Sequence, residues 1–109
     1  MSAGAEADLV NFADRPLAPE AEGIASRAVE VNGVRWAVVE YEPAILRQEW
    51  CHEGHSGYVV AGDITYEFDD GARPIRVSAG QAFRLPDAQG HRGRAGADGA
   101  RLFLIDRAV

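Results

Sequence analysis

From residue 26 onward, turn-forming residues interrupt the chain at short and regular intervals, and this spacing restricts the fold more than any other feature. The interruptions lie at 61–63, 69–71, 79–80, 86–90 and 96–99, and each contains glycine. Short apolar or alternating runs separated by such turns are typical of all-β sandwiches and barrels. No long run outside the N-terminal segment has helical periodicity. The sequence therefore predicts an all-β domain.

The first two strands are predicted around a tight turn at Asn32 and Gly33, within the run AVEVNGVRWAVVEY. Asn-Gly supplies the two positive φ angles of a type I′ hairpin turn. In ITYEF, alternation places Ile64, Tyr66 and Phe68 on one face of a strand. Further strands are predicted at 44–51, 57–61, 63–68, 74–78, 81–85, 91–95 and 101–107.

The N-terminal segment differs from the rest of the chain in composition. Residues 1–23 are rich in Ala, Glu, Asp and Pro and have no sustained period. We interpret them as a surface arm, extended or partly disordered, because chain ends are poorly ordered unless they are held in place. Residues 24–109 are predicted to form a single barrel domain, since a chain of 109 residues has material for one hydrophobic core.

Charge and cysteine content exclude several classes of function. A net charge of −6 disfavours a nucleic-acid-binding surface, which needs basic residues to neutralise phosphates. A single cysteine cannot form an internal disulfide, so folding needs no oxidising compartment. No signal-peptide pattern and no apolar run of membrane-spanning length is seen. We expect a cytoplasmic protein that binds neither nucleic acid nor membrane.

The string GQAFRLPDAQGH contains a motif with a clear structural logic. Gly80 turns the chain into a strand, Pro86 ends that strand, and the following loop delivers His91 to the next strand. This spacing resembles the second signature motif of the cupin superfamily. Ala88 stands where the family usually has glycine, and Ala95 stands where it usually has asparagine.

A second string, HSGYVVAG, resembles the C-terminal half of the first cupin motif, with Gly62 in the tight turn. When the two are aligned on Gly62, the metal-binding glutamate of the family falls on His55. The two histidines of the family's His-x-His pair fall on Glu49 and Cys51. The resemblance covers residues 43–95, and the flanking residues match only in their strand pattern.

The resemblance implies a cupin-type antiparallel β-barrel, that is, a double-stranded β-helix or jelly roll, with a metal site at its mouth. The implied ligands are Cys51, His55, His91 and Glu49. Glu49 and Cys51 are two residues apart, so on a strand they point to the same face. Cysteine with histidine favours a divalent transition metal, zinc or iron, over magnesium or calcium.

Other interpretations of these residues stay open. His52 replaces a neighbour as ligand if a bulge shifts the strand. A cysteine nucleophile assisted by His52 is disfavoured, because adjacent strand residues face opposite ways and nearby acids oppose a thiolate. A free cysteine also often packs as a small apolar group. Aromatic side chains expected near a substrate pocket are Tyr58, Tyr66 and Trp50.

Two functional hypotheses follow. The first is a metal-dependent enzyme acting on a small polar organic substrate, with Glu49 as a further ligand or the general base. The resemblance implies dioxygenase, isomerase, lyase or decarboxylase chemistry. The second is a metal-free cupin module that binds or senses a small ligand without catalysis. In either case we expect a homodimer, which would cover exposed sheet edges.

Overall fold

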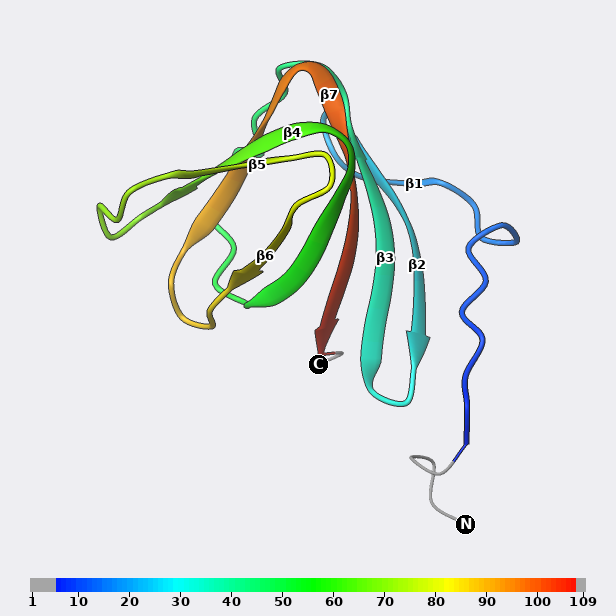
Figure 1. The fold of residues 1–109 in the computed structure, drawn as a ribbon. Helices are drawn as coiled ribbons and strands as arrows, with labels where there is room; N and C mark the ends of the chain where they lie inside the picture. The colour runs from blue at the N-terminus through cyan, green and yellow to red at the C-terminus, as the bar shows by residue number, and fades with distance from the viewer. Residues whose placement is uncertain (1–5, 108–109) are drawn as a thin grey trace.

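The computed structural model describes residues 6–107, and within this range every regular element is a β-strand (Figure 1). No helix in the described range is long and apolar enough to cross a membrane. The strands are β1 (Ala18–Ala21), β2 (Ile24–Val31), β3 (Val34–Tyr41), β4 (His55–Phe68), β5 (Ile75–Ser78), β6 (Ala82–Leu85) and β7 (His91–Arg107).

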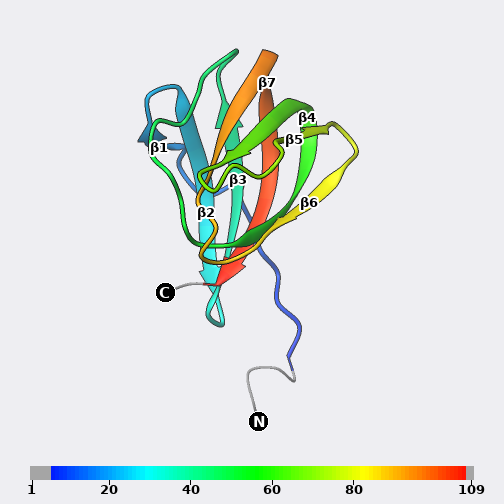
Figure 2. The ribbon, with the colours of Figure 1, turned by 90° about the vertical axis from the view of Figure 1, so that its left-hand side faces the viewer.

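All strand pairs are antiparallel, and the sheet order is β1-β2-β3-β7-β4-β5, with β6 also pairing with β4. Turning the molecule by 90° shows β5 and β6 on one side of the barrel and β2 and β3 on the other (Figure 2). The inward faces of the strands form the core, whose largest fully buried side chains are Ile64, Leu85, Leu102, Val39 and Val59. The predicted all-β barrel is confirmed.

The hairpin between β2 and β3 forms where the sequence predicts it. Asn32 and Gly33 have φ angles of 50° and 77°, and Val31 pairs directly with Val34. This is the two-residue loop that a type I′ turn requires. The hairpin fixes the register of β3, whose inward positions Ala37 and Val39 are buried.

Two predicted chain breaks are wrong, because 61–63 and 96–99 lie inside single long strands. β4 continues through 61–63 with register shifts on either side of Gly62, and β7 continues through 96–99. Gly62 and Gly99 both have positive φ angles, 72° and 79°. Such bulges bend a strand without ending its pairing, and Figure 1 shows β4 and β7 bending sharply at the same end of the barrel.

The predicted strand at 44–51 is also wrong. Ala44 has a φ of 59°, which breaks the extended backbone directly after Pro43. The segment that follows makes only two isolated bridges to β7, one of them between Cys51 and His91. Residues 44–51 are therefore a loop that runs beside β7, and strict alternation of its side chains is lost.

The predicted N-terminal arm contributes a strand of its own. Its last residues form β1, which pairs with β2 through an irregular ladder, and all four residues of β1 are exposed. Further upstream, the ring of Phe12 lies edge-on to Phe103 of β7, with centroids 6.3 Å apart. The domain boundary between residues 23 and 24 stays a prediction. Residues 1–5 of the predicted arm and residues 108–109 of the predicted barrel lie outside the described residues.

Ala88, the residue that stands where the cupin motif has glycine, has a φ of 71°. A left-handed backbone costs an alanine about 1–2 kcal/mol. We therefore expect Ala88→Gly to raise the free energy of unfolding by about 1 kcal/mol in urea titrations. Ala82→Gly, in the exposed first position of β6, is the control and is expected to lower it, because glycine weakens a strand. Equal effects of the two changes would contradict this explanation.

Candidate functional site

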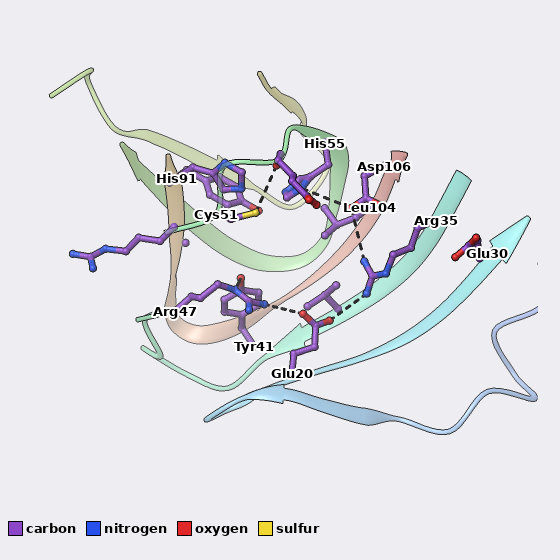
Figure 3. Close-up of a pocket in the computed structure, with 15 residues that line it drawn as sticks. Glu20, Glu30, Arg35, Tyr41, Arg47, Cys51, His55, His91, Leu104 and Asp106 are labelled. Atoms are coloured by element: carbon purple, nitrogen blue, oxygen red, sulfur yellow. Dashed lines mark hydrogen bonds and ion pairs between the residues drawn. The ribbon is translucent and has the colours of Figure 1, made fainter. Parts of the chain in front are cut away.

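The barrel encloses a cavity of about 420 Å³ lined mostly by polar and charged side chains (Figure 3). Its apolar floor includes Val39 and Leu104. A cavity of this size is within the range of small-molecule sites. Its polar lining residues are Glu20, Glu30, Arg35, Tyr41, Arg47, Cys51, Glu53, His55, Tyr66, His91, Arg92 and Asp106.

Two histidines face one another at the cavity, from the first residues of β4 and β7. The ring centroids of His55 and His91 are 4.9 Å apart and the rings are nearly perpendicular. His91 is buried, and the side chain of His55 is 12% exposed. Burial, reinforced by the neighbouring His91, lowers the pKa of His55 to about 4, and burial lowers the pKa of His91 as well. Both imidazoles are therefore neutral at pH 7, which is the form that ligates metal ions.

A buried ring atom of His91, Nδ1, has no hydrogen-bond partner among residues 6–107. Leaving such an atom unpaired costs roughly 1–3 kcal/mol, so its retention is a feature to be explained. The backbone of Cys51 exchanges hydrogen bonds with that of His91, both at 2.9 Å, which fixes the cysteine beside the histidine. The Sγ atom of Cys51 is 3.6 Å from the carbonyl oxygen of Glu53.

These donors provide a test of whether a divalent transition ion fits the cavity. Two neutral imidazoles, one with an orphaned nitrogen, and an adjacent thiol are appropriate ligands. Within residues 6–107, however, no three His, Cys, Asp or Glu side chains are already gathered closely enough to hold an ion. The two histidines and the adjacent Cys51 are thus donors of a suitable kind, but they are not gathered into a formed ion site.

Glu49 is the one predicted metal ligand that the structure places elsewhere. It is exposed and lines a separate hollow between β1 and the 44–49 loop. The cause is the irregular backbone of that loop, since the expected alternation of Glu49 with Cys51 requires a strand. The predicted roles of Glu49 as ligand and general base have no geometric support at the cavity.

Of the other residues predicted for the site, one lines the cavity and three lie outside its lining. Tyr66 lines the cavity and is 3% exposed. Tyr58 is 44% exposed on the outer side of β4, and Trp50 lies under the guanidinium of Arg92, 4.2 Å from it, outside the cavity lining. His52, the alternative ligand, is exposed and its Nε2 is 3.0 Å from Asp69. The structure brings together His55, His91, Cys51 and Tyr66.

The opposite wall carries a chain of charged groups (Figure 3). The carboxylate of Glu20 lies 3.0 Å from Arg47 and 3.7 Å from Arg35. Arg47 also donates to the hydroxyl of Tyr41 at 3.3 Å. Arg35 continues to Asp106 at 3.9 Å, and Asp106 lies 3.9 Å from Nδ1 of His55. The distance between Asp106 and Nδ1 of His55 is too long for a hydrogen bond.

Burial changes the protonation of this wall in different directions. Burial raises the pKa of Asp106. Burial also acts to raise the pKa of Glu20, but the Ser26 side chain and the Arg47 guanidinium outweigh it, so the pKa is lowered. Burial opposes the charge of Arg47, whereas Tyr41 and Glu20 favour it, and its pKa is raised. Glu20 and Arg47 are therefore both charged at neutral pH.

This charged wall was not predicted from the sequence, although the strand pattern of β3 and β7 indicates part of it. In β3 and β7 the inward-facing series of apolar residues ends in Tyr41 and Asp106, and a polar residue continuing a buried face marks a lined cavity. Arg35 lies on the same parity as Tyr41. Glu20 and Arg47 left no such signal, because the segments around them have no regular alternation.

Strand order, bent long strands and a polar cavity at the barrel mouth together define a cupin fold. No model of a protein family and no curated protein sequence matches the chain. The fold is therefore established by likeness to solved structures.

Two solved structures illustrate the likeness. A tryptophan-to-phenylalanine variant of oxalate decarboxylase from Bacillus subtilis superposes with a TM-score of 0.75 at 19% identity, over 94% of this chain and 31% of that chain. KdgF from a Halomonas species superposes with a TM-score of 0.74 at 18% identity, over 95% of this chain and 96% of that one. The chain thus spans about a third of oxalate decarboxylase and nearly all of KdgF. Another structure of the oxalate decarboxylase concerns its Mn(II) centres.

Proposed function

We propose that this cupin barrel binds a small polar molecule in its cavity and that His55 and His91 hold a divalent transition-metal ion beside it. The observation that carries the proposal is the pair of neutral imidazoles 4.9 Å apart, one with a buried unpaired nitrogen. Cys51 would supply a further donor. An ion held there would act as a Lewis acid toward an oxygen of the bound molecule.

The pattern of burial supports this assignment over a purely structural role for the histidines. A structural histidine in a barrel normally satisfies both ring nitrogens with hydrogen bonds. His91 does not, and the nearby Asp106 is too far from His55 to accept a hydrogen bond. The Mn(II) centres of oxalate decarboxylase, a protein with the same fold, are consistent with such a site.

The test is the metal content of protein purified without chelators, measured by plasma mass spectrometry. We expect about one transition ion per chain, lost on His91→Ala and on His55→Ala. His52→Ala removes the remaining histidine, which is exposed and paired with Asp69, and should leave the metal content unchanged. Cys51→Ser is expected to weaken binding of zinc more than binding of manganese, because thiolates favour softer ions.

Two results would contradict the metal assignment. One is protein without any transition ion whose thermal unfolding midpoint does not rise when zinc, iron or manganese is added. The other is full occupancy in folded His91→Ala protein, which would place the ion elsewhere.

A second candidate function is a metal-free small-molecule-binding module, and one observation favours it. Among residues 6–107 no three donor side chains are gathered for an ion, whereas the cavity itself is fully formed. The same measurements separate the two candidates. A metal-free module keeps its ligand affinity in the presence of a chelator and after His91→Ala.

A further inference from the structure

A single carboxylate bridges two arginines at the wall of the cavity. Oε1 of Glu20 lies 3.0 Å from Nη2 of Arg47, and Oε2 lies 3.7 Å from Nη2 of Arg35. The side chains of Arg47 and Arg35 are only 25% and 35% exposed, and both line the cavity. Two guanidinium groups that converge on one carboxylate from different segments form a binding arrangement for a planar anion.

The element that supplies this carboxylate is a short strand at the edge of the barrel. β1 is a four-residue edge strand, it pairs only with β2, and its ladder contains an irregularity between Pro19 and Ala21. As whole residues its members are exposed, although the side chain of Glu20 is only 24% exposed. The arginines, by contrast, stand on β3 and on a loop that hydrogen-bonds to β7. Glu20 is therefore carried by a different and less regularly paired element than the two arginines.

Glu20 also separates two hollows. It lines the main cavity together with Arg47, and the same two residues line the hollow between β1 and the 44–49 loop. The Glu20–Arg47 ion pair thus lies between the cavity and the outer hollow. Partly exposed ion pairs of this kind contribute little individually, so an incoming group of the same charge can replace one.

We propose that Arg35 and Arg47 form the recognition site for a carboxylate group of the bound molecule, and that Glu20 occupies this site when the molecule is absent. This inference rests on the proposed ligand binding in the cavity and does not depend on the metal ion. Glu20 acts as a tethered competitor, whose effective concentration lowers the affinity for a free carboxylate.

The charges around the two arginines favour an anion over a neutral ligand. When Glu20 leaves, the contacts that remain among the described residues are those of Arg47 with the hydroxyl and ring of Tyr41 and that of Arg35 with Asp106 at 3.9 Å. Several guanidinium N–H donors are then without an acceptor inside a half-enclosed cavity. A carboxylate restores both charge balance and hydrogen bonds, whereas an uncharged amide restores only the hydrogen bonds.

The experiment compares malonate with its uncharged analogue malonamide, each titrated into chelated protein and into protein as purified, with affinity measured by calorimetry or NMR. Glu20→Gln removes the competing charge, so we expect the Kd for malonate to fall about tenfold. Affinity for malonamide should change little. In wild-type protein, malonate should also perturb the amide signals of β1, because Glu20 is displaced.

Glu22→Gln is the matched control. It removes the same charge from the same segment, but Glu22 lines the outer hollow and not the cavity, and it is exposed. Its affinity for malonate should equal that of the wild type. Arg47→Met and Arg35→Met should each abolish malonate binding, and thermal unfolding shows which of the two variants is folded.

The proposal is overturned if Glu20→Gln binds malonate no tighter than the wild type does, or if a folded arginine variant keeps wild-type affinity. These outcomes differ from a failure of the proposed function. If the protein binds no metal but Glu20→Gln still binds malonate about tenfold more tightly, only the metal assignment fails. If all variants bind malonate and malonamide equally well, the proposed ligand binding in the cavity stands and the proposed carboxylate site is wrong.

Discussion

Gly62→Ala is expected to lower the free energy of unfolding by roughly 3 kcal/mol. Gly62 has a φ of 72°, a conformation that costs alanine about 1–2 kcal/mol. A Cβ there would also overlap the backbone carbonyl of Gly99 on β7, and such overpacking adds about 1–3 kcal/mol. Because domains of this size are stable by only about 5–15 kcal/mol, the loss is a large fraction of the total. Urea unfolding followed by tryptophan fluorescence measures it.

Gly80→Ala separates the two contributions. Gly80 also has a positive φ, 91°, but a Cβ there would meet nothing within 4 Å. We expect this variant to lose only the conformational part, about 1 kcal/mol. If both variants lose the same amount, the close approach of β4 and β7 at Gly62 has no energetic role.

This close approach explains why the sequence predicted the all-β fold correctly but misplaced several strand ends. Glycines at 62 and 99 are turn signals in a one-dimensional pattern, and both do have positive φ angles. Here they face each other across a strand pair that remains hydrogen-bonded on both sides. A glycine that bends a strand and one that ends it are indistinguishable in the sequence, because the difference lies in the partner strand.

The same limit applies to the site. His55 and His91 come together as the resemblance implies, although in the antiparallel ladder of β4 and β7 the pairing partner of His91 is Phe68, at the opposite end of β4 from His55. The prediction for Glu49 required regular alternation, and the backbone at Ala44 removes it. Glu20 lies far from the motifs in sequence and reaches the cavity only because β1 adds to the edge of β2. Pairings of this kind depend on tertiary context that local patterns do not contain.

The buried histidines also predict how stability depends on pH in metal-free protein. In the unfolded chain His55 binds a proton below about pH 6.5, whereas in the folded protein burial and the neighbouring His91 lower its pKa to about 4. Between these values the unfolded state binds more protons, so stability falls as the pH falls. The difference between the two pKa values of His55 corresponds to about 3 kcal/mol of stability, and most of this stability is lost by about pH 4. Above about pH 6.5 this residue causes no further change.

The measurement is urea unfolding from about pH 7.5 to about pH 4 in the presence of a chelator, for wild type and His55→Gln. Asp106 acts in the opposite direction, because burial raises its pKa, so the informative quantity is the difference between the two curves. That difference should change by about 3 kcal/mol between about pH 6.5 and about pH 4. Parallel curves for wild type and His55→Gln would mean that the pKa of His55 is the same in the folded and the unfolded protein, so that burial does not keep this imidazole neutral below about pH 6.5.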